Sequence, residues 1–104
     1  MQAEVLKGHL EMLLLATLAV EPAHGYGLVE RLRERSRGAF DLAEGTVYPA
    51  LHRLEAAGLL SSQWSREAPR RRRVYRLTDR GRSALAAETL GWRGFARAVD
   101  SVLS

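Results

Sequence analysis

Apolar residues between positions 44 and 60 recur at the spacing of an amphipathic helix. Four of them fall at i, i+3, i+4 and i+7 and form one stripe: Val47, Ala50, Leu51 and Leu54. The opposite face has no carboxylate and carries Gly45, Thr46, Pro49, His52, Arg53 and Ala56. We expect Pro49 in the first turn, where a missing N–H costs little, and Gly58 at the end of the helix. A helix with this outer face can enter the major groove of DNA.

Residues 10–20 predict an earlier helix that is apolar almost all round. A small domain cannot bury a helix on every side, so this helix needs a second cover, from its own C-terminal helix or from another chain. Leu10 and Leu14 are the residues we expect at that contact. Residues 1–7 are polar enough to fray or to form an arm.

A shorter helix and a hairpin are expected on either side of the 44–60 stretch. Residues 24–36 predict the helix, and residues 40–42 suggest a brief strand-like connection. Residues 60–65 and 73–77 read as two strands joined by a polar loop, with Trp64 as the large apolar anchor of the first. This order predicts a winged helix-turn-helix, a mainly α fold with a small β-hairpin.

The last helix should begin after Thr78, a good N-cap, and run to about residue 103. Apolar residues repeat there every seven positions, as at a helix–helix seam. The residues expected at an interface between two chains are Leu10, Leu14, Leu85, Trp92, Val99 and Val102. We therefore divide one compact unit into a winged domain, residues 1–78, and a dimerisation helix, residues 79–104.

Composition narrows the function. The chain has 104 residues, enough for one small domain, and a formal net charge of +4, which fits an anionic partner. There is no cysteine, so disulfide and thiol chemistry are excluded. No apolar run is long enough to cross a bilayer and no signal peptide is evident, so we expect a cytoplasmic protein.

Catalytic and cofactor motifs are missing from the sequence. His9, His24 and His52 show no metal-ligand spacing, and no glycine-rich phosphate loop or nucleophile elbow is present. We therefore expect a protein that is not an enzyme and that needs no cofactor or metal.

A run of four arginines, Arg70 to Arg73, lies at the tip of the predicted hairpin. Four guanidiniums on a protruding wing can bind phosphates or reach into a minor groove. The alternative is a solvated charged turn that keeps a sheet edge from pairing with other chains. The neighbouring groove-sized helix favours DNA contact.

Several motifs together resemble the PadR family of bacterial transcriptional regulators. They are Gly25-Tyr26-Gly27, Glu44-Gly45-Thr46-Val47-Tyr48-Pro49-Ala50-Leu51, Gly58-Leu59-Leu60, Trp64 and Tyr75-Arg76-Leu77-Thr78-Asp79-Arg80-Gly81. The resemblance runs from about Leu10 to the C-terminus. It implies sequence-specific DNA binding as a homodimer on a palindromic operator, most often as a repressor, and it places Tyr26 near the DNA backbone.

The DNA-contact residues expected from the helix face, the wing and this resemblance are Tyr26, Thr46, Tyr48, Pro49, His52, Arg53, Arg70, Arg71, Arg72 and Arg73. For Tyr48 two roles stay open, packing against the sheet or donating its hydroxyl to a phosphate. Tyr26 is equally compatible with a buried position behind an ordinary helix cap.

Trp92 matches the tryptophan with which short PadR-like regulators bind planar aromatic compounds between two chains. The resemblance therefore implies an aromatic effector site, and helical spacing gives Trp92 the neighbours Glu88, Phe95 and Ala96. Plain packing at a helix–helix interface is the alternative for Trp92. For the whole chain, the alternatives are a winged-helix module that binds proteins and an aromatic-ligand-binding protein without an operator.

Overall fold

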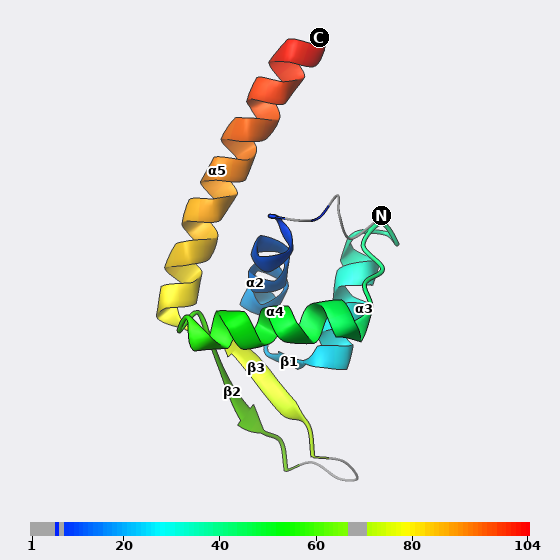
Figure 1. Cartoon of the computed structure of the whole chain (residues 1–104), viewed down its shortest axis with the longest axis vertical. Helices are drawn as coiled ribbons and strands as arrows, with labels where there is room; N and C mark the ends of the chain where they lie inside the picture. The colour runs from blue at the N-terminus through cyan, green and yellow to red at the C-terminus, as the bar shows by residue number, and fades with distance from the viewer. Residues whose placement is uncertain (1–5, 7, 67–70) are drawn as a thin grey trace.

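The computed structural model describes residues 6, 8–66 and 71–104. Its helices are α2 (Leu10–Val20), α3 (Gly25–Arg35), α4 (Glu44–Ala56) and α5 (Asp79–Leu103), and its strands are β1 (Ala23–His24), β2 (Leu60–Trp64) and β3 (Arg73–Leu77). The predicted winged helix-turn-helix with a long last helix is confirmed. Figure 1 shows α5 rising away from the other helices, while the β2–β3 hairpin points in the opposite direction.

The sheet has three antiparallel strands in the order β1-β3-β2. The pair Ala23↔Tyr75 aligns β1 with β3, and Leu60↔Leu77 aligns β2 with β3. The prediction of a brief strand at residues 40–42 was wrong, because that connection has no regular secondary structure. Leu42 instead packs into the core as a buried side chain. Strand β1, which the sequence did not predict, is only two residues long and therefore too short to give a period-two pattern.

The inner stripe of α4 lies at the centre of the core, as predicted. Val47, Ala50, Leu51 and Leu54 are all buried, together with Leu28 of α3 and Tyr75 of β3. Apolar burial of this extent is the main stabilising term in a small domain.

Two expectations about the N-terminal part of the chain need correction. Leu14 is 0% exposed within one chain, in which α2 contacts α5, α3, α4 and the sheet. It therefore has no surface for a second chain, whereas Leu10 is only partly buried against the core. Leu6 is also buried, so that residue belongs to the core rather than to a frayed arm.

Pro49 was expected in the first turn of its helix, but it lies in the second turn, because α4 already begins at Glu44. Its missing N–H leaves the carbonyl of Gly45 without the usual helical donor. Gly45 and Pro49 are both exposed, so water can reach that carbonyl.

The start of α5 is joined tightly to the base of the wing. The Thr78 hydroxyl accepts from the Gly81 N–H at 3.0 Å and donates to the Gly58 carbonyl at 2.8 Å, which confirms the predicted N-cap. A Cβ on Gly81 would overlap the Leu59 carbonyl oxygen, so only glycine allows this close approach. Gly58 has a φ of +80° and ends the preceding segment, as predicted.

Candidate nucleic-acid interface

The outer face of α4 is open to solvent. Gly45, Pro49, His52, Arg53 and Ala56 are exposed, and Thr46 is half-buried. The face carries a hydroxyl, an imidazole and a guanidinium among small residues, and the carboxylates of α4, Glu44 and Glu55, lie outside it. This combination suits donor contacts to base edges and phosphates.

A groove of about 580 Å³ separates the start of α3 and α4 from the wing. Its lining residues come from five elements and the adjoining hairpin loop: His24, Gly25, Tyr26, Glu44, Tyr48, His52, Trp64, Arg71, Arg72, Arg73 and Tyr75. Arginines form one wall and the tyrosines of α3 and α4 form the other. The groove thus joins the helix face to the wing in one surface that is rich in aromatic rings and on which three arginines outnumber one carboxylate.

Trp64 was expected to be the large apolar anchor of its strand, but it is 51% exposed. The reason is its place at the outer end of β2, beyond the apolar side chains that the sheet buries. The Arg71 guanidinium lies 5.1 Å from the indole centroid, and the Arg73 guanidinium lies 5.3 Å from it. Cation–π contacts of this kind hold the arginine side chains in place on the wing.

Arg73 has further partners inside the protein. Its Nε donates to the Ser62 hydroxyl at 2.7 Å, and its Nη2 lies 3.9 Å from Glu55 Oε2. The Ser62 hydroxyl in turn donates to the same Glu55 carboxylate. This network ties the wing to α4, and the Glu55 carboxylate offsets part of the Arg73 charge. Arg73 therefore positions the wing as well as adding positive charge to it.

His24 caps α3 and contacts the wing. Its Nδ1 accepts from the Gly27 N–H at 3.1 Å, and its Nε2 lies 2.9 Å from Arg72 Nη1. Burial lowers the pKa of the imidazole below its ordinary value, and the Arg72 and Arg31 guanidiniums lower it further. The ring is therefore neutral at neutral pH.

The groove tyrosines of α3 and α4 differ in burial. Tyr26 is 52% exposed, and its hydroxyl donates to Glu30 Oε1 at 3.0 Å, a bond that raises the pKa of the phenol. Tyr48 is half-buried and lies over the start of α3, where a Cβ on Gly25 would come within 2.5 Å of its ring. Glycine at position 25 is therefore required for α3 and α4 to approach this closely.

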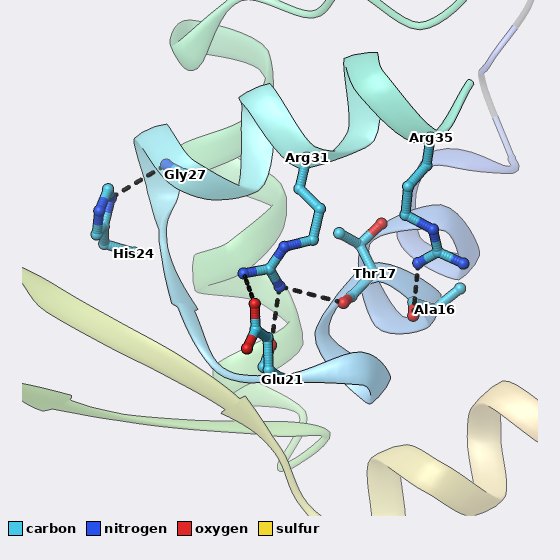
Figure 2. Close-up of polar contacts among 7 residues, drawn as sticks. All are labelled: Ala16, Thr17, Glu21, His24, Gly27, Arg31 and Arg35. Carbon is cyan, nitrogen blue, oxygen red and sulfur yellow. Dashed lines mark hydrogen bonds and ion pairs between the residues drawn. The ribbon is translucent and has the colours of Figure 1, made fainter. Parts of the chain in front are cut away.

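Arginines from α3 fix the angle between α2 and α3 (Figure 2). Arg31 donates from Nη1 to the Glu21 carbonyl at 3.0 Å and pairs through Nη2 with Glu21 Oε1 at 3.0 Å. Arg35 Nη1 reaches the Ala16 carbonyl at 3.5 Å. The last turn of α2 has no basic residue of its own, so α3 supplies the cations that its free carbonyls favour.

The predicted DNA-contact residues fall into three groups. The groove brings together Tyr26, Tyr48, His52, Arg71, Arg72 and Arg73. The rest of the helix face carries Thr46, Pro49 and Arg53, outside the groove lining. Arg70 lies outside the described residues. The predicted set left out five lining residues, namely His24, Gly25, Glu44, Trp64 and Tyr75. The β1–β3 pairing and the hairpin register, which local sequence signals do not show, bring His24, Trp64 and Tyr75 to the groove.

The predicted effector residues lie on the exposed part of α5. Trp92 is 42% exposed and Phe95 is 59% exposed, with ring centroids 6.1 Å apart. Glu88 is exposed and Ala96 is half-buried nearby on the same helix. His9 meets the Trp92 ring edge-on at 5.1 Å, a neighbour that the helical spacing of α5 could not predict.

Residues 6, 8–66 and 71–104 contain no group of three His, Cys, Asp or Glu side chains placed to hold a metal ion. No helix in the same part of the chain combines the length and the hydropathy that a membrane span needs.

Comparison with known proteins gives consistent results. The profile of the PadR-like family of transcriptional regulators matches residues 14–87. Transcriptional regulator Rv3488 of Mycobacterium tuberculosis is 45% identical over 76 residues, which cover 73% of this chain and 68% of the relative. The PadR family regulator of Eggerthella lenta is 35% identical with a TM-score of 0.86, over 98% of this chain and 88% of that one. The PadR family regulator of Clostridium difficile is 30% identical with a TM-score of 0.78, over 90% of this chain and 97% of that one.

The titration of His24 predicts a loss of stability in weak acid. The unfolded chain takes up this proton near the ordinary pKa of 6.5, whereas the folded chain takes it up only at lower pH. The stabilising contribution is therefore complete above that ordinary value and is lost as pH falls towards the folded pKa. The unfolding midpoint should fall more between about pH 7.5 and about pH 5.5 in the wild type than in His24→Asn.

Asparagine is the matched control, because it can still accept from the Gly27 N–H but does not titrate. Arg72→Gln should also reduce the loss, since it removes a charge that opposes protonation. Equal losses in the wild type and His24→Asn would contradict the assignment.

Proposed function

The chain belongs to the PadR-like family of transcriptional regulators, and we propose that it binds duplex DNA through α4 and the wing. In this proposal α4 enters the major groove, with Thr46, Pro49, His52 and Arg53 towards the bases. The wing arginines and Tyr26 follow the phosphate backbone. Members of this family are regulators rather than enzymes, so the prediction of a non-enzyme is confirmed.

The observation that carries this proposal is the continuity of the exposed α4 face with the basic groove. His52 belongs to both surfaces, so one approach of DNA can place bases on α4 and phosphates on Arg71 and Arg72. Proteins on this fold that bind only other proteins have no need of such a surface. A regulator that binds chromosomal DNA works where the chromosome lies, so the location we propose is the cytoplasm.

We further propose that two copies associate through α5. Apolar side chains stay exposed along the helix, namely Leu90, Trp92, Phe95, Val102 and Leu103, while Leu85 packs against the core. A helix that projects with so much uncovered apolar surface gains stability from a partner helix. A two-fold dimer would present two winged domains, residues 1–78, to a palindromic operator, and repression follows where that operator overlaps a promoter.

We also propose that a planar aromatic effector binds where the two copies of α5 meet. A two-fold axis near Trp92 would set two indoles face to face, with Phe95 and Ala96 as apolar neighbours. Glu88 would favour a cationic guest. The guest would act by shifting the angle between the two winged domains.

The DNA proposal predicts a steep salt dependence. The logarithm of the affinity for a duplex taken from upstream of the gene should fall by roughly 0.9 per phosphate contact with the logarithm of salt. Replacing Arg71 and Arg72 by Ala should flatten that slope by about one to two units and keep the base preference. Fluorescence anisotropy measures both quantities.

Arg82→Ala is the control, because it removes an exposed arginine that does not line the groove. If the slope of the double variant matches that of the wild type, the wing does not lie on the backbone. If the wild type fails to bind DNA, a protein-binding module becomes the better description.

The dimer proposal predicts that a charge on the α5 seam separates the chains. Val99→Asp should give monomer or aggregate in light scattering, because a carboxylate would be buried without a partner. Ser101→Asp is the matched control, since two residues further along lies about 200° round the helix at 3.6 residues per turn. An intact dimer in Val99→Asp would refute this interface.

The effector proposal predicts that Trp92 emission is quenched by a planar cationic dye such as proflavine. The chain has two tryptophans, so Trp64→Phe leaves Trp92 as the only indole, which is excited selectively at wavelengths where tyrosine does not absorb. Trp92→Ala should abolish tight dye binding, measured by the anisotropy of the dye, and leave the dimer intact. Unchanged dye binding in Trp92→Ala would reduce Trp92 to plain interface packing.

A further inference from the structure

One row of residues on α4, formed by Glu44, Tyr48 and His52, faces the groove. The three recur at i, i+4 and i+8, so they lie in line along the helix, and all of them line the groove. His52 belongs to the outer face of α4 as well, so the row adjoins the surface proposed to meet the bases. Glu44 is exposed at the first position of α4, at the end from which recognition helices contact base edges.

Charge is divided unevenly between the two walls of the groove. The wing wall carries three arginines, whereas Glu44 is the one carboxylate among the described residues that line the groove, and it belongs to the α4 wall. The arginines have contacts of their own. Arg71 and Arg73 lie on the Trp64 ring, and Arg72 bonds to the imidazole that caps α3. The groove therefore offers cations on the wing and a carboxylate at the start of α4.

A carboxylate in a surface that binds DNA selects what it meets. It repels phosphates, because both groups carry negative charge, and it accepts hydrogen bonds from amino groups. In the major groove cytosine presents its N4 amino group, whereas guanine and thymine present acceptors. Adenine presents an amino group beside the N7 acceptor, which repels a carboxylate. Cytosine is therefore the base that suits Glu44.

We propose that Glu44 is a specificity-determining residue that accepts a hydrogen bond from the N4 amino group of a cytosine in the major groove. This inference rests on the proposed DNA-binding function and assigns one base preference within it. Glu44 lowers the affinity for other sequences, since its charge then meets an acceptor or a phosphate without a compensating bond. Its effect is opposite in sign to that of the wing arginines, which raise the affinity for every sequence.

Selection from a random pool of duplexes tests the base preference. Duplexes with about 20 random base pairs are selected on the full chain as wild type, Glu44→Gln and Glu44→Ala, and the bound sequences are compared. The wild type should enrich cytosine at one position. Both variants should lose that preference and keep the preferences at the other positions, because the rest of the helix face is unchanged.

Fluorescence anisotropy then measures the effect on the selected duplex and on the same duplex with this cytosine changed to thymine. The wild type should bind the thymine duplex about tenfold more weakly, because the O4 acceptor replaces the amino donor. In Glu44→Ala the two affinities should differ by less than about twofold, since no group is left to distinguish the bases. The variant should also bind the thymine duplex more tightly than the wild type does, because the repelling charge is gone.

Glu34→Gln is the matched control, because Glu34 is exposed on α3 and lies outside the groove lining. It removes the same charge and should keep both the enriched cytosine and the difference between the two duplexes. Glu44 is exposed, so both of its variants are expected to fold, and thermal unfolding followed by circular dichroism verifies this.

The possible outcomes separate this inference from the proposed function. If the wild type enriches a sequence but the Glu44 variants keep every base preference, the cytosine contact is wrong and DNA binding stands. An equal gain in affinity for all duplexes would mean that Glu44 only repels phosphates, and an equal loss would reduce it to a structural residue of the first turn. Either result overturns the inference. If the wild type enriches no sequence, sequence-specific binding fails and the inference falls with it.

Discussion

Burial of the α4 stripe is the constraint on which the rest of the structure depends. Val47 and Leu51 have no exposed surface, so α2, α3 and the sheet must all close on this one side of the helix. That enclosure leaves only the opposite side free, and it fixes the rotation of α4 about its own axis. The exposure of His52 and Arg53 is therefore a direct consequence of core packing.

The wing arginines lie close together, and contacts within the same chain hold two of their side chains in place. Like charges repel, and long side chains lose conformational entropy when they bind. Trp64 offsets part of both costs, because its ring attracts two guanidiniums and restricts their motion. Glu55 and Ser62 then fasten Arg73 to α4. An apolar anchor in the core would have stabilised the wing but left its arginines unrestrained.

Much of this arrangement followed from local signals in the sequence. The 3.6-residue period placed the α4 stripe, and the Thr78 cap and Gly58 marked the right ends, because these signals depend on near neighbours. The site was predicted less completely. His24 meets Arg72 only because a two-residue strand pairs with β3, and such a short strand has no periodic signal. Leu14 was misplaced for a related reason, since apolarity alone cannot tell whether the cover comes from the same chain.

In the proposed dimer, the junction at Thr78 would give α5 a mechanical role beyond the contact between the two chains. The Thr78 bonds and the close approach of Gly81 to the Leu59 carbonyl leave little freedom where the helix leaves the wing. A helix of 25 residues is about 37 Å long at 1.5 Å per residue. Because its junction with the wing is tight, a tilt of the whole helix would turn the base of the wing with it. The proposed aromatic effector at Trp92 would bind partway along this helix. Its differential affinity for two tilts, rather than its affinity alone, would set how strongly it changes the spacing of two α4 helices.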